Sequence, residues 1–236
     1  MRLRHRMIRA TALALALVTG SALTACSSDK PAEAKKLTAV EQLAAAKAKA
    51  DAATSLHLTL RSSGIPDSAN GVLAADGSGT HAPAFKGTLD ARIAGFAAKV
   101  EVVAIDKLLY LKLPFTTEFA ETDPKQFNAP NPALLFASDG GITSLMTATT
   151  NPVEGEQTRA GADILTTISG KLPGSTVEKL LNFGDGTKTY DVTYGITDRG
   201  GELRTVTLVG PFFKGATSTY VLTLDKYGAP VEITKP

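Results

Sequence analysis

Alternation of apolar and polar residues with a period of two recurs along most of the chain, and it restricts the fold more than any other feature. Leu56, Leu58 and Leu60 begin the series by alternating with polar residues. This period is typical of half-buried β-strands, because successive side chains point to opposite faces of a sheet. Further runs are Leu89, Ala91 and Ile93, then Val192, Tyr194 and Ile196, and then Tyr220, Leu222 and Leu224. The sequence therefore predicts about ten or eleven strands, in two groups.

Short turn signals separate these runs, and they indicate how the strands are connected. Spacers of two residues join antiparallel neighbours, whereas parallel strands need a long crossover. The predicted turns are Asp76-Gly77, Ala94-Gly95, Asp106-Lys107, Gly200-Gly201 and Tyr227-Gly228. The expected sheet is therefore antiparallel.

One hairpin can be predicted in register. If Ala94-Gly95 is a two-residue turn, Ile93 lies opposite Phe96 and every residue on one face of both strands is apolar. That face comprises Leu89, Ala91, Ile93, Phe96, Ala98, Val100 and Val102, and the next strand continues it with Leu109, Leu111 and Leu113. The opposite face carries Asp90, Arg92, Lys99 and Glu101. Either a filled core or a lipid-binding cavity could lie against such an apolar face.

Three segments have helical patterns instead. Residues 39–53 are rich in alanine and lysine, and Thr38 and Glu41 before them have the spacing of a capping box. Residues 132–147 form a second helical region, with Asp139 expected to cap a short second helix, and residues 173–182 form a third. The second region contains Leu134, Leu135, Ile142, Leu145 and Met146. The predicted fold class is α+β: an antiparallel sheet with helices across its apolar face.

The amino-terminal segment predicts export and lipid attachment. Four arginines precede an apolar stretch, residues 10–18, which is too short to span a membrane. Leu23-Thr24-Ala25-Cys26 follows and resembles a bacterial lipobox, which implies cleavage before Cys26 and acylation of its thiol. We expect residues 1–25 to be a signal peptide, 26–37 a lipidated tether and 38–236 a single domain on the extracytoplasmic face of the cell membrane.

Charge argues against nucleic-acid binding. Taking the four arginines of the signal peptide from the 25 basic residues leaves 21, against 23 acidic ones, so the processed chain has a formal charge of −2. It has no basic stripe and no aromatic platform for bases. No later apolar run approaches the length of a membrane-spanning helix, so the acyl group on Cys26 would be the only anchor.

Sequence motifs of catalysis are missing as well. The chain lacks a nucleophile elbow, a phosphate-binding loop, a zinc-protease motif and paired cysteines. After processing only His57 and His81 remain as histidines, too few for a catalytic triad or a metal site. We expect no enzymatic activity, no metal and no cofactor.

Several stretches resemble the LppX/LprA/LprF/LprG family of mycobacterial and related actinobacterial lipoproteins. Residues 222–236 are similar to its closing hairpin, residues 105–110 to its Asp-x-x-Leu-Tyr hairpin, and 152–155 and 168–170 follow in the same order. The family's usual tryptophan is replaced by Tyr227 in the closing turn. This resemblance implies a curved antiparallel half-barrel whose helices cross the concave face and enclose an apolar cavity.

The same resemblance implies a function: binding a multi-acyl glycolipid or triacylglycerol and shuttling it from the plasma membrane toward the outer envelope, with a membrane efflux transporter as a further partner. The alternative is a non-catalytic scaffold lipoprotein with a solid core. The residues expected to line the cavity are Leu89, Ala91, Ile93, Phe96, Ala98, Val100, Val102, Leu109, Leu111, Leu134, Leu135, Ile142, Leu145 and Met146. The last five lie on the helices expected to form a movable cover.

Overall fold

The computed structural model describes residues 36–93, 95–127 and 129–236. Leu37–Pro236 form one compact unit, which is described here by itself. The predicted signal peptide, Cys26 and all but the end of the predicted tether lie outside the described residues.

The unit is built on one antiparallel sheet of eleven strands that does not close into a barrel, as the alternation predicted. In order across the sheet the strands are β6-β5-β4-β3-β2-β1-β11-β10-β9-β8-β7. Their bounds are β1 Ser55–Ser63, β2 Gly71–Thr80, β3 Ala84–Ile93, β4 Phe96–Ile105, β5 Leu108–Lys112, β6 Ala120–Thr122, β7 Thr150–Ala160, β8 Asp163–Pro173, β9 Thr189–Thr197, β10 Leu203–Phe213 and β11 Ala216–Asp225.

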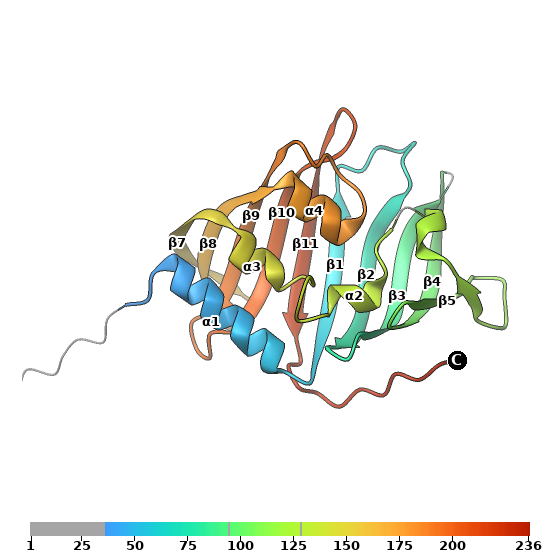
Figure 1. Ribbon diagram of the computed structural model, residues 1–236, viewed down its shortest axis with the longest axis horizontal. Helices are drawn as coiled ribbons and strands as arrows, with labels where there is room; N and C mark the ends of the chain where they lie inside the picture. The colour runs from blue at the N-terminus through green and yellow to red at the C-terminus, as the bar shows by residue number, and fades with distance from the viewer. Residues whose placement is uncertain (1–35, 94, 128) are drawn as a thin grey trace, which may run out of the picture. The chain divides into compact units, whose positions relative to one another are not determined.

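Two meanders meet in the middle of this sheet. β1 to β6 run outward to one edge, β7 to β11 run inward from the other, and β1 pairs with β11 at the junction (Figure 1). Leu58 lies opposite Leu224 and Leu60 opposite Leu222, so both strands present leucine to the same face. The apolar face is therefore continuous across the junction.

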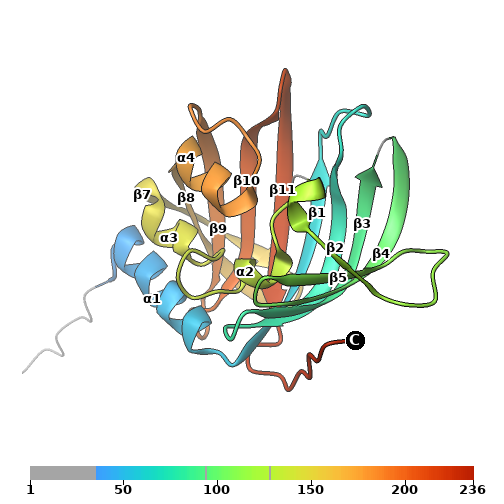
Figure 2. The ribbon, with the colours of Figure 1, turned by 45° about the vertical axis from the view of Figure 1, so that its right-hand side comes forward.

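Helices cover only the concave side of the sheet. In Figure 1, α1, α3 and α4 lie across the β7–β11 half. The short α2 packs against β3 and β4. Figure 2 shows the curvature of the strands around the helices. Their bounds are α1 Ala39–Ala52, η1 Pro124–Phe127 (a 3-10 helix), α2 Pro132–Leu135, α3 Ser144–Ala148 and α4 Gly174–Leu181. This arrangement confirms the predicted α+β half-barrel with helices on its apolar face.

The predicted hairpin register is confirmed. Ile93 pairs with Phe96, Leu89 with Val100, and Gly95 adopts a positive φ of 83° that suits a tight turn. β5 continues the sheet, with Leu111 opposite Val102. The capping box of α1 is also present, because Thr38 and Glu41 bond reciprocally.

One predicted turn is wrong, and one predicted hairpin is absent. Asp76-Gly77 lies inside β2, where a Cβ on residue 77 would come within 2.5 Å of the Phe85 ring, so Gly77 permits close packing rather than a turn. Tyr227-Gly228 does form a turn, as predicted, but the closing hairpin is absent, since no strand follows β11. Both edges of β11 are already paired, with β1 and β10, which leaves no edge for a returning strand.

Asp139 does not cap a helix. It lies in a turn, and α3 begins at Ser144, with Thr143 as the preceding residue. No helix in the described part of the chain combines the length and apolar character needed to cross a membrane.

On the convex side of β5, Lys235 near the carboxyl end places its ammonium group 5.3 Å from the centre of the Tyr110 ring.

Candidate ligand cavity

An apolar cavity of about 380 Å³ lies on the concave side of the β2–β5 half of the sheet, and it is partly open to solvent. Its wall is formed by alternating residues of β3, β4 and β5, and its cover by the segment from η1 to the start of α2. Phe183 and Phe213 close the side toward β11. The lining residues are Ala69, Asn70, Gly71, Val72, Leu89, Ala91, Arg92, Ile93, Val100, Leu109, Leu111, Leu113, Pro124, Gln126, Ala129, Pro130, Pro132, Phe183 and Phe213.

Six residues of the predicted set lie together in this lining. They come from three adjacent strands and face the cavity because their alternation places them on one side of the sheet. They are Leu89, Ala91, Ile93, Val100, Leu109 and Leu111. Whether they contact a ligand stays a prediction.

Two predicted strand residues are buried or packed beside the cavity rather than in its lining. Val102 is fully buried, and Ala98 packs against the hydrophobic core. Phe96 differs from both, because its side chain is 78% exposed where the β3–β4 hairpin extends past the covering helices.

The helical residues predicted as a movable cover do not line this cavity. Ile142, Leu145 and Met146 are fully buried in the hydrophobic core, because the chain around α3 packs between α1 and β8 instead of over β3–β5. Leu134 points outward with 45% exposure, and Leu135 packs against the core. The residues that cover the cavity precede α2 or begin it, and they are Pro124, Gln126, Ala129, Pro130 and Pro132.

Sequence reasoning missed the aromatic wall. Phe183 follows α4, whose end is set by Asn182 in a left-handed conformation with φ of 60°. Its ring lies 6.0 Å from those of Phe213 and Tyr220. Phe183 is distant in sequence from Phe213 and Tyr220, so no local pattern could have brought it to them.

Tyr220 lies behind this wall, in the packed half of the sheet. Its ring is 4.7 Å from Phe212, and its side chain is buried. Among the described residues its hydroxyl has no hydrogen-bond partner. Burial raises the pKa of that hydroxyl well above its ordinary value. The same cause raises the pKa of Tyr194, partly offset by the hydrogen bond with Thr149.

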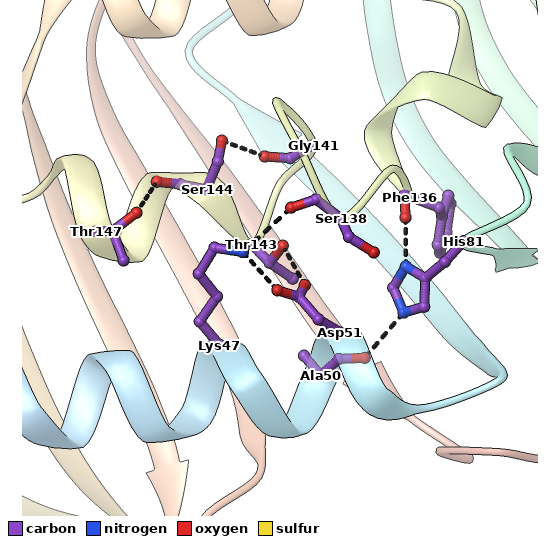
Figure 3. A network of polar contacts seen from close by, with 10 residues as sticks. All are labelled: Lys47, Ala50, Asp51, His81, Phe136, Ser138, Gly141, Thr143, Ser144 and Thr147. Atoms are coloured by element: carbon purple, nitrogen blue, oxygen red, sulfur yellow. Dashed lines mark hydrogen bonds and ion pairs between the residues drawn. The ribbon is translucent and has the colours of Figure 1, made fainter.

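A polar network fixes the chain between α2 and α3 onto α1 (Figure 3). Lys47 donates from Nζ to the Ser138 carbonyl at 3.1 Å, and Thr143 donates from Oγ1 to Asp51 at 2.8 Å. Lys47 and Asp51 also form an ion pair one helical turn apart. These bonds hold the α2–α3 connection in place against the carboxyl-terminal half of α1.

His81 completes the network on the side nearer the cavity. Its Nδ1 lies 2.6 Å from the Phe136 carbonyl oxygen and its Nε2 2.9 Å from that of Ala50, so both ring nitrogens face acceptors (Figure 3). The Phe136 ring in turn stacks on Phe85 of β3 at 5.7 Å. His81 thereby links the end of α1 to the residue that follows α2, the helix whose first residue lines the cavity.

His57 is the centre of a small polar cluster outside the cavity. His57 lies on the opposite face of β1 from Leu56 and Leu58, between Asp225 at 2.6 Å and Asp76 at 3.2 Å. Within residues 36–236, leaving aside positions 94 and 128, no three histidine, cysteine, aspartate or glutamate side chains come together as a metal site.

Fold and cavity together define an open antiparallel half-barrel with an apolar pocket under its concave-side cover. The sequence model of the LppX_LprAFG lipoprotein family matches residues 36–233, and the chain belongs to this family. This result confirms the resemblance found in the sequence.

Solved structures show the same fold. LprF from Mycobacterium bovis is 16% identical with a TM-score of 0.69, over 84% of this chain and 96% of that one. Lipoprotein LppX from Mycobacterium tuberculosis is 21% identical with a TM-score of 0.62, over 83% of this chain and 98% of that one. No curated protein matches the sequence.

Proposed function

We propose that this lipoprotein binds an acylated lipid in the cavity and carries it from the plasma membrane toward the outer cell envelope, held at the membrane by acylation of Cys26. The observation that carries the proposal is the apolar cavity of about 380 Å³ beneath a cover made of loops and a short helix. A scaffold with a solid core would need no such void, because protein interiors pack with few voids larger than a water molecule.

The chemistry of the lining suits acyl chains. Leucine, isoleucine, valine and alanine form the wall, and phenylalanine and proline form most of the rest. Burying a methylene group contributes about 0.8 kcal/mol relative to water. In a bilayer those groups are already dry, so transfer into the cavity is nearly balanced in free energy. Such balance allows a carrier to release its lipid as well as to take it up.

The volume limits what can bind without movement. The cavity lies in the lower part of the range of roughly 300–1,000 Å³ found for small-molecule sites. A glycolipid or triacylglycerol with several acyl chains exceeds that volume. Loading such a lipid therefore requires displacement of the cover, from Pro124 to Pro132, or of the Phe183 ring.

A matched pair of substitutions tests the proposal. Ala91 lines the cavity, whereas Ala97 is exposed on the same β3–β4 hairpin. Ala91→Phe would fill the cavity and Ala97→Phe would not. Intact lipid is extracted with solvent from each folded, purified full-length protein and identified by mass spectrometry, apart from the covalently bound acyl chains.

We expect lipid with the wild-type chain and with Ala97→Phe, and a loss of most of it with Ala91→Phe. Equal lipid from both variants would place binding elsewhere. Absence of lipid from all three proteins, under conditions where they are folded, would favour the scaffold function.

A further inference from the structure

Two phenylalanine side chains project into solvent at the edge of the cavity. Phe115 is fully exposed at 100%, and Phe96 is 78% exposed. Single exposed apolar residues are common on protein surfaces. These two differ in their position, because each ends a row of residues that line the cavity.

The first row runs along the β3–β4 hairpin. Leu89, Ala91 and Ile93 line the cavity, and Phe96 lies directly opposite Ile93 across the turn. By strand alternation Phe96 therefore belongs to the same face of the sheet as the cavity wall. Its ring is exposed because the hairpin extends beyond the cover.

The second row runs along β5 and continues past its end. Leu109, Leu111 and Leu113 line the cavity, and Phe115 lies two residues further along, in the turn that follows the strand. The backbone N–H of Thr116 donates to the Leu113 carbonyl at 3.1 Å, which closes a turn around Pro114 and Phe115. The Thr116 hydroxyl donates to the same oxygen at 3.0 Å, so Phe115 is presented at the tip of a hydrogen-bonded turn.

Two basic residues on these strands, Arg92 and Lys112, are already in ion pairs, and Lys99 lies opposite the acidic Asp90. Arg92 lies 3.3 Å from Asp67, and Lys112 lies 3.3 Å from Glu101. Because each of these basic side chains has an acidic partner, this part of the protein is only weakly attracted to an anionic surface. Any surface that covers Phe96 and Phe115 is therefore recognised by apolar contact.

We infer that Phe96 and Phe115 form a docking rim that inserts into the surface of the lipid bilayer, so that the cavity opens against the membrane. Aromatic side chains at loop tips suit the interface between lipid headgroups and acyl chains. A lipid leaving the bilayer then passes along apolar rows into the cavity without crossing water. This inference rests on the proposed function, because it supplies the route by which the ligand enters.

Tryptophan fluorescence provides the test, since the chain contains no tryptophan. Phe96→Trp and Phe115→Trp each place one reporter on the rim. Val153→Trp is the control, because Val153 is 65% exposed on β7, at the opposite edge of the sheet. The full-length acylated variants are bound to phosphatidylcholine vesicles with and without brominated acyl chains, which quench tryptophan on contact.

We expect strong quenching and a blue-shifted emission for both rim variants and little of either for the Val153 variant. The acyl anchor is common to all three, so it cannot produce the difference. Phe96→Ser added to the Phe115→Trp protein, and Phe115→Ser added to the Phe96→Trp protein, should each lower the ratio of docked to undocked protein about tenfold. Quenching should change little with salt or with added phosphatidylglycerol.

Equal quenching at all three positions would overturn the docking rim. So would a blue shift that depends on protein concentration and occurs without vesicles, because it would show that a second copy of the chain covers the rim.

Adding Ala91→Phe to the tryptophan variants separates docking from ligand binding. Quenching that disappears with Ala91→Phe would come from brominated lipid inside the cavity. That result would overturn the docking rim and leave the proposed lipid binding standing. Quenching that persists, combined with no extractable lipid in wild type, would support docking and defeat the proposed function.

Discussion

The two halves of the sheet share one alternation pattern but differ in what covers them. On β8 to β10 the concave face is filled by large side chains such as Ile168, Tyr194 and Leu208, each at most 1% exposed. On β3 the corresponding Leu89, Ala91 and Ile93 are only partly buried and line a cavity. The helices α1, α3 and α4 cover the first half (Figure 1). The second half is covered by two short helices, η1 and α2, and by loop residues between them. The comparison shows that the cover, and not the strand pattern alone, decides whether an apolar sheet face becomes core or cavity.

Truncating one leucine in each half would test this contrast most strongly. Leu208→Ala removes a side chain that is 1% exposed, and it should lower the free energy of unfolding by about 2–5 kcal/mol. Leu89→Ala enlarges a cavity that already exists and should lower it by about 1 kcal/mol. Urea unfolding of both variants measures the difference. Equal losses would mean that the cavity half is packed as tightly as the other.

The next largest effect should come from His81, which connects the halves. His81→Leu leaves the carbonyl groups of Ala50 and Phe136 without their partner and should lower the free energy of unfolding by about 1–3 kcal/mol. It should also loosen Phe136 and so increase uptake of an apolar fluorescent dye by the folded protein. Thr143→Val is the control, since it removes a bond of the same network on the α3 side. Increased dye uptake by both variants alike would contradict a specific link between His81 and the cover.

The smallest effect should be a gain in stability. Tyr220→Phe removes a buried hydroxyl that has no partner among the described residues, so it should raise the free energy of unfolding by about 1 kcal/mol at neutral pH. Because the pKa of Tyr220 is raised in the folded state, the unfolded chain loses this proton first as the pH rises above about 10, which destabilises the wild type. The advantage of the variant should therefore grow above that pH in urea titrations. A loss of stability would show that the hydroxyl is satisfied, for example by water.

Local patterns predicted the elements of the fold well. Alternation and turn dipeptides gave the antiparallel strands and the register of Ile93 opposite Phe96, because both depend on neighbours in sequence. The same reasoning failed at Gly77, which accommodates the Phe85 ring, a contact with a neighbouring strand. The family resemblance failed after Tyr227, where the turn forms but no strand returns, because both edges of β11 are already paired.

Only one wall of the cavity, the apolar face of the strands, could be predicted from the sequence. The face containing Leu89 and Val100 followed from the hairpin, but the choice between a core and a cavity depends on segments distant in sequence. Ile142, Leu145 and Met146 have the helical spacing expected of a cover, yet they pack into the core of the other half. Phe183 and Phe213 close the cavity without any motif that marks them.

The order of the strands has a consequence for how the chain reaches this structure. β1 is the first strand and β11 the last, yet they are hydrogen-bonded neighbours in the middle of the sheet. Each meander can form from local hairpins, but their joining requires a contact between residues about as distant as the chain allows, and such contacts form slowly. The complete sheet therefore cannot assemble until the final strand is available. A chain exported through a membrane in an extended form would meet this condition only once β11 itself has been translocated.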